Sequence, residues 1–86
     1  MPDDAFTLYL IYIRDPQTPL DPDTFDGMRR LDDALFLIRT TASRSRVYHS
    51  VKWACQPAAL LVAPLGDDPK FKGMDAGALN WLRHLD

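Results

Sequence analysis

The segment FTLYLIYI, residues 6–13, is rich in aromatic and β-branched side chains and ends at a turn formed by Arg14, Asp15 and Pro16. This composition favours a β-strand, because such side chains pack well on a pleated surface. Both sets of alternate positions in the segment are largely apolar, whereas a strand with one face in water alternates apolar and polar residues. The segment therefore predicts a central strand that is covered on both faces.

Two further strands and a helix are predicted downstream. The strands are ALFLIRT, residues 34–40, and AALLVA, residues 58–63, which Pro64 is expected to end. Between them, Thr41 or Ser43 can cap a helix that Pro57 prevents from continuing. At about 100° per residue, one arc of about 120° on this helix holds the apolar residues Val47, Tyr48, Val51, Ala54 and Cys55.

The remaining segments predict loops and shorter helices. Prolines at positions 16, 19 and 22 predict a loop, from which Asp21 or Asp23 can cap a short helix through about Arg29. After a turn at residues 66–69, a final helix is expected over about residues 75–85. Asp75 is its expected N-cap.

Two architectures fit these elements. If residues 27–32 are extended, they pair with residues 34–41 across a tight turn at Asp32 and Asp33. This gives an α+β fold with a small ferredoxin-like sheet, helices packed on it and a C-terminal helix. If residues 27–32 are helical, two βαβ units form a three-layer parallel sheet. Two aspartates without glycine make a mediocre hairpin turn, so the pattern leaves both architectures open.

Length and composition predict one domain over residues 1–86. At 86 residues and 47% apolar content, a core is possible but thin, and oligomerisation often supplies the rest. The single cysteine, Cys55, cannot form an intramolecular disulfide, and no apolar run is long enough to span a bilayer. The N-terminal residues are acidic where a secretory signal would be basic, so we expect a cytoplasmic protein without a membrane partner.

Charge is sorted along the chain. Residues 34–56 contain Arg39, Arg44, Arg46 and Lys52 and no acidic residue, although the whole chain has a net charge of −2. Basic side chains in the first turn of a helix, such as Arg44 and Arg46, oppose the helix dipole. A bound anion would offset that cost, as would ion pairs with aspartates from the N-terminal third of the chain. The basic stretch suggests a surface that meets another molecule.

Trp53 falls nearly opposite the apolar arc of the predicted helix. It either anchors a partner, with Arg46 and His49 beside it, or is covered by the loop at residues 66–74 or by a second copy of the chain. The alternation of basic and apolar residues at positions 70–74 predicts that Phe71 and Met74 fold inward while the lysines stay in water. The predicted binding residues are Arg39, Arg44, Arg46, His49, Lys52 and Trp53.

No pattern predicts catalysis. His49 and Cys55 differ by about 120° around the helix, which disfavours a Cys-His pair within this element. Neither a glycine-rich phosphate loop nor a zinc-ligand spacing is present, so no catalytic residue, metal ligand or cofactor is assigned.

One family resemblance is carried by the first strand, by MRRLDDALFLI at residues 28–38, by the helix after it and by ALLVAPL at residues 59–65. These segments resemble small ferredoxin-like proteins related to the CRISPR protein Cas2 and to SinR-type proteins. The resemblance implies a homodimer. In some members of that group an aspartate at the end of the first strand supports metal-dependent cleavage of nucleic acid. The nearest acid here is Asp15, which lies beyond the usual place.

The function expected from the sequence is that of a small, cytoplasmic, non-catalytic binding protein that forms a homodimer. A protein partner is favoured over nucleic acid, because a net charge of −2 and a pI near 5.5 oppose attraction to a polyanion. An accessory or inhibitor protein of a mobile element or defence system would fit this description. The alternative is a Cas2-like metal-dependent nuclease or nucleic-acid-binding protein.

Overall fold

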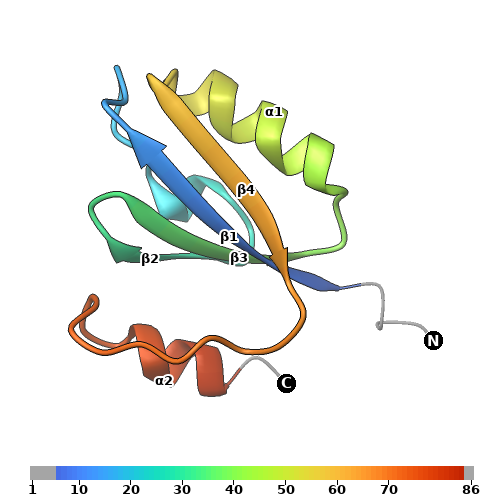
Figure 1. The fold of residues 1–86 in the computed structure, drawn as a ribbon, viewed down its shortest axis with the longest axis vertical. Coiled ribbons are helices and arrows are strands. Elements are labelled where there is room, and N and C mark those ends of the chain that lie inside the picture. Colours follow the sequence, from blue (N-terminus) through green and yellow to red (C-terminus); the bar gives the residue numbers. More distant parts are fainter. Residues whose placement is uncertain (1–5, 85–86) are drawn as a thin grey trace.

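Strand β1 (Thr7–Arg14) lies inside a four-stranded sheet of order β2-β3-β1-β4 (Figure 1). The computed structural model describes residues 6–84. Every pair of neighbouring strands runs antiparallel, so the alternative prediction of a parallel sheet is not supported. The central position of β1 and the α+β class are confirmed. The other elements are β2 (Met28–Asp32), β3 (Leu35–Thr40), β4 (Ala59–Leu65), the 3₁₀ helix η2 (Pro22–Thr24) and the α-helices α1 (Arg44–Cys55) and α2 (Ala78–Arg83).

The sheet is covered on opposite faces by α1 and α2 (Figure 1). Successive side chains of a strand point to opposite faces, so in β3 Phe36 and Ile38 pack towards α1 while Leu37 packs towards α2. We call the two groups the α1-side core and the α2-side core. The buried residues of the α1-side core are Tyr9, Ile11, Ile13, Leu20, Met28, Phe36, Ile38, Val47, Val51 and Cys55. Those of the α2-side core are Leu31, Leu37, Ala78 and Leu82.

A hairpin joins β2 to β3, as the first of the two predicted architectures requires. Its turn lies at Asp33 and Ala34, one residue later than expected. Gly27 starts the hairpin with a φ of 80°, a left-handed conformation that favours glycine, and its carbonyl accepts a hydrogen bond from the Arg39 N–H at 2.9 Å. A helix over residues 27–32 would have lost this pairing and the burial of Leu31.

The loop between β1 and β2 contains less helix than predicted. A helix through about Arg29 is wrong, because the helical turn ends at Thr24. The predicted cap at Asp21 is confirmed, since its carboxylate accepts a hydrogen bond from the Asp23 N–H at 2.9 Å. The loop packs Leu20 and Phe25 against the α1-side core. It therefore covers part of the face that α1 leaves open.

Helix α2 is shorter than predicted, and Asp75 is not its N-cap. Gly77 occupies that position, with a φ of 86° and no side-chain hydrogen bond. The Asp75 N–H instead donates to the Leu31 carbonyl at 2.7 Å, and the Asp75 carboxylate accepts from Arg30 Nε at 2.9 Å. The segment before α2 is thus fastened to β2. The predicted residue 85 lies outside the described residues.

Strand β4 continues through Pro64 to Leu65, two residues beyond its predicted end. β4 is an edge strand, and the register pairs Pro64 with Tyr9 of β1. A proline can occupy an edge strand when its nitrogen points away from the neighbouring strand, because no hydrogen bond within the sheet is then lost. Among the described residues, no helix is both long enough and apolar enough to cross a bilayer.

Candidate contact surface on helix α1

Trp53 is the most exposed large hydrophobic side chain of the described residues, with 73% of its surface in solvent. Helix α1 buries Val47, Val51 and Cys55, which recur every four residues and face the sheet. Trp53 lies on the opposite side of the helix. The predicted cover by the loop at residues 66–74 is absent, because Phe71 and Met74 pack into the α2-side core on the other face of the sheet.

Arg46 and His49 lie on the same side of the helix as Trp53. They precede it by seven and four residues, so the three side chains follow one line along α1. All three are exposed. The imidazole ring of His49 packs edge-on to the ring of Tyr48, with 5.2 Å between centroids and 83° between planes. We call Arg46, His49 and Trp53 the outer face of α1.

Two residues predicted for the core of α1 are exposed instead. Tyr48 has 36% of its surface in solvent, and Ala54 is also exposed. The buried stripe of α1 is narrower than the predicted arc because the helix packs on one face of the sheet, which covers only the residues closest to it.

All charged residues of α1 are basic. The helix contains Arg44, Arg46 and Lys52 and no acidic residue. Neither arginine forms an ion pair within residues 6–84, where the salt bridges both involve Arg30. The predicted cap is confirmed, since Ser43 Oγ accepts a hydrogen bond from the Arg46 N–H at 3.2 Å. This cap uses one of the N–H groups that the predicted anion site would need.

Arg39 is separated from the other predicted binding residues. It alternates with Ile38 and Thr40 on β3, so its side chain leaves the sheet on the face opposite α1. There its guanidinium carbon lies 4.1 Å from the centre of the Phe6 ring, a cation-π contact. Of the six predicted residues, five therefore share helix α1, and Arg39 belongs to a different surface.

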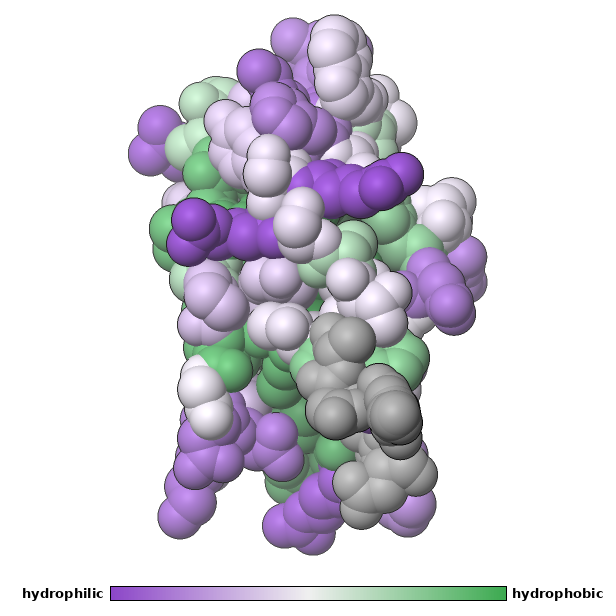
Figure 2. Space-filling view, turned by 90° about the vertical axis from the view of Figure 1, so that its right-hand side faces the viewer, coloured by the Kyte–Doolittle hydropathy of each residue, from purple (hydrophilic) through white to green (hydrophobic). Residues whose placement is uncertain are grey.

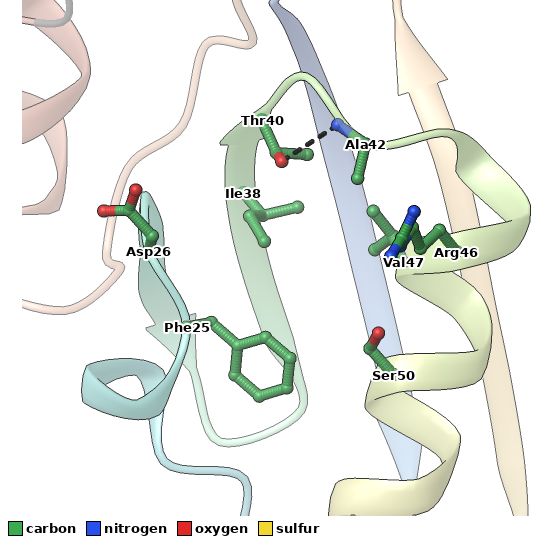
Figure 3. A pocket seen from close by; sticks show the side chains of 8 residues that line it. All are labelled: Phe25, Asp26, Ile38, Thr40, Ala42, Arg46, Val47 and Ser50. Atoms are coloured by element: carbon green, nitrogen blue, oxygen red, sulfur yellow. Dashed lines mark hydrogen bonds between the residues drawn. The ribbon is translucent and has the colours of Figure 1, made fainter.

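A pocket of about 190 Å³ adjoins the outer face of α1 (Figure 3). Figure 3 shows Phe25 pointing into the space between β3 and α1, with Asp26 on the far side of that space. The lining residues are Phe25, Asp26, Ile38, Thr40, Ala42, Arg46, Val47 and Ser50. The sequence predicted only Arg46 among them as a binding residue, because nothing local indicates that the η2 loop meets α1.

Within residues 6–84, Cys55 does not share a surface with His49 and Asp15, since it is buried and they are exposed. Cys55 is fully buried, its Sγ donates to the Val51 carbonyl at 3.4 Å, and burial raises the pKa of its thiol, whereas His49 is exposed. Asp15 is exposed at the end of β1, with a φ of 50°. Within residues 6–84, no three histidine, cysteine or acidic side chains lie close enough together to hold a metal ion.

Comparisons with protein-family models, with curated proteins and with solved structures found no match to this chain. The resemblance to Cas2-like and SinR-type proteins therefore stays a prediction.

Proposed function

We propose that this chain is a small binding protein of the cytoplasm that works through contact and not through catalysis, with the outer face of α1 as its contact surface. The observation that carries the proposal is the exposure of Trp53, at 73%. Its neighbours on the same line, Arg46 and His49, are exposed as well. Tryptophan and arginine are the residues that most often dominate the energy of protein interfaces.

Burial of Trp53 by a partner would supply much of the affinity. A tryptophan buries roughly 150–250 Å² in a core or interface, and most of that area is still in water here. At about 25 cal/mol per Å², its transfer into an interface is worth roughly 3–4 kcal/mol before the costs of association. Truncation of such an anchor typically costs at least about 2 kcal/mol, or roughly 30-fold in Kd.

The charge of α1 indicates the chemistry of the partner. Arg44, Arg46 and Lys52 give this helix a positive surface, although the chain has a net charge of −2. A polyanion such as nucleic acid is repelled by that net charge, whereas a protein needs only a local acidic rim. The partner we propose is therefore a protein with an apolar cleft for Trp53 and acidic residues around it.

We also propose that the chain forms a homodimer and that its sheet is a reduced ferredoxin-like sheet, with η2 in place of a first helix. The antiparallel order β2-β3-β1-β4 supports the second proposal. A thin core supports the first, because small domains often bury further apolar surface through self-association.

Capture of partners from a lysate of the source organism tests the contact surface. We expect the wild-type protein to retain a specific protein, and Trp53→Ala and Arg46→Ala each to release it. Leu79→Ala and Arg83→Ala, at exposed positions on α2, are the matched controls and should retain it. Equal capture by all five proteins would refute the assignment of α1.

Titration of labelled DNA and RNA at low and near-physiological salt separates the two partner classes. Salt-sensitive binding that is lost in Arg44→Ala/Arg46→Ala would assign the same surface to nucleic acid instead. We expect no binding near physiological salt.

A further inference from the structure

The two edges of the sheet differ in how they are protected. At the β2 edge, the Asp75 N–H donates to the Leu31 carbonyl and the Asp75 carboxylate binds Arg30, so another segment covers the strand. The opposite edge, β4, is seven residues long and carries no charged residue. Within residues 6–84, no strand pairs with its outer side. An uncharged, apolar edge strand of this kind is a ready template for pairing with another strand.

The register shows which backbone groups of β4 point outward. The Ile13 N–H donates to the Ala34 carbonyl across β1 and β3, so odd-numbered residues of β1 bond to β3 and even-numbered residues bond to β4. Tyr12 of β1 is opposite Leu61 of β4. The N–H and C=O groups of Leu61 therefore face β1, whereas those of Leu60 and Val62 and the C=O of Pro64 face away from it.

The backbone N–H and C=O groups of β4 that face away from β1 form a short row, which ends at Pro64. Leu60 and Val62 each present one N–H and one C=O, and Pro64 presents only a C=O because proline has no N–H. Leu61, between them, points its side chain to the sheet face opposite α1 and has 52% of its surface exposed. Any added strand must therefore be centred near Leu61.

This row is complementary to itself. In an antiparallel pair of two β4 strands with a two-fold axis at Leu61, Leu60 of one copy is opposite Val62 of the other. Each of these residues then both donates and accepts, which gives four backbone hydrogen bonds and leaves no N–H of the row unpaired. No like charges meet, because β4 contains none.

Apolar side chains flank the edge on both faces of the sheet. On one face Leu61 would meet Leu61 of the second copy. On the other face, Ser50 lines the pocket with Ile38 and Thr40 of β3, which places it on the β3 side of α1. Tyr48 lies about 160° from Ser50 around the helix and so faces β4, with 36% of its surface exposed. Figure 2, which views the right-hand side of Figure 1, shows hydrophilic side chains across the upper part and at the bottom of that face, with pale and hydrophobic residues between them.

We propose that β4 pairs antiparallel with β4 of a second copy of this chain, with the two-fold axis at Leu61, and so joins two four-stranded sheets into one. The proposal goes beyond the contact surface on α1, because Trp53 does not take part and stays free for another partner. An interface of one short strand pair belongs to the small, weak class, so we expect a dissociation constant in the micromolar range.

The test is sedimentation equilibrium of the wild-type protein and of charge variants at the axis. We expect a dimer at high-micromolar concentration, and a monomer for Leu61→Lys and for Leu61→Glu, because each places like charges directly opposite one another. A mixture of the two variants should dimerise again, which only pairing between copies explains. Leu79→Lys, a similar change on α2, should leave the dimer intact.

Disulfide formation tests the axis without a charged side chain. Leu61→Cys should form a covalent dimer on mild oxidation and Leu79→Cys should not, while the native Cys55 is buried. A wild-type monomer at high-micromolar concentration would overturn the proposal, as would a dimer that persists in Leu61→Lys. Binding of an unrelated extended peptide to a monomer would assign the β4 edge to a different protein.

Discussion

Replacement of Trp53 by alanine should leave the fold almost as stable as before. With 73% of the side chain exposed, roughly 50–70 Å² is buried in the monomer, if a whole tryptophan buries about 200–250 Å². At about 25 cal/mol per Å², the loss is roughly 1–2 kcal/mol. Alanine has the higher helix propensity, which returns up to about 0.7 kcal/mol. We therefore expect a net decrease of about 1 kcal/mol in the free energy of unfolding.

Trp81→Ala is the matched control, because it removes the same side chain from the other α-helix. Trp81 is half-buried and packs against the α2-side core, so its loss should cost about 2–3 kcal/mol, below the 3–5 kcal/mol typical of fully buried aromatic residues.

Urea unfolding followed by circular dichroism measures both variants. The protein concentration should be low, so that no dimer covers either side chain. The slope of free energy against urea should stay unchanged while the midpoint falls. If Trp53→Ala loses as much stability as Trp81→Ala, Trp53 is covered within the monomer and the assignment of the outer face of α1 is wrong.

Three further predictions concern stability. Gly27→Ala should destabilise the fold more than Gly73→Ala, because both glycines have positive φ values, 80° and 79°, but only at Gly27 would the new Cβ collide with the Arg39 carbonyl. Thermal unfolding should show a loss of about 1–2 kcal/mol in the free energy of unfolding for Gly73→Ala and a clearly larger loss for Gly27→Ala. Equal losses would contradict the close approach of Gly27 to Arg39. Ser43→Ala should cost about 1 kcal/mol, because the Arg46 N–H loses its cap; an unchanged melting temperature would argue against that hydrogen bond. The hydrogen bond from Arg30 lowers the pKa of Asp75, so the pair stabilises the fold at pH values above the ordinary aspartate pKa of about 3.9, and this stabilisation is lost as the pH falls through the lower pKa of the folded state. Asp75→Asn should therefore be less stable than the wild type at neutral pH. Acid titrations monitored by circular dichroism should show that this difference in stability shrinks at low pH.

The sequence predicted correctly those features that depend only on residues a few positions apart in the chain. The two-faced strand at residues 6–13 and the position of Trp53 opposite the buried residues of α1 both follow from side-chain periods of 2 and 3.6, which are properties of a single element. Ser43 and Asp21 were each one of two predicted caps for the same reason, since a cap bonds to N–H groups two or three residues away.

Where sequence reasoning failed, a contact between distant residues decided the outcome. Asp75 has the composition of a helix cap, yet it is bonded to Arg30, 45 residues away. Pro64 looked like the end of a strand, but the register places its nitrogen on an open edge where no hydrogen bond is lost. Arg39 belongs to the basic stretch in the sequence and leaves the sheet on the other face from α1.

The sequence by itself determined a mixture of helices and strands, the central strand β1 and a basic helix with Trp53 opposite its buried residues, because these depend on periodicity and composition. Only the tertiary structure decided between hairpin and parallel sheet, covered the β2 edge of that sheet and left β4 without a second partner strand in the part of the chain that the structure describes. Strand order and edge exposure depend on which distant segments meet, and pairing energies of that kind leave no local pattern in the chain.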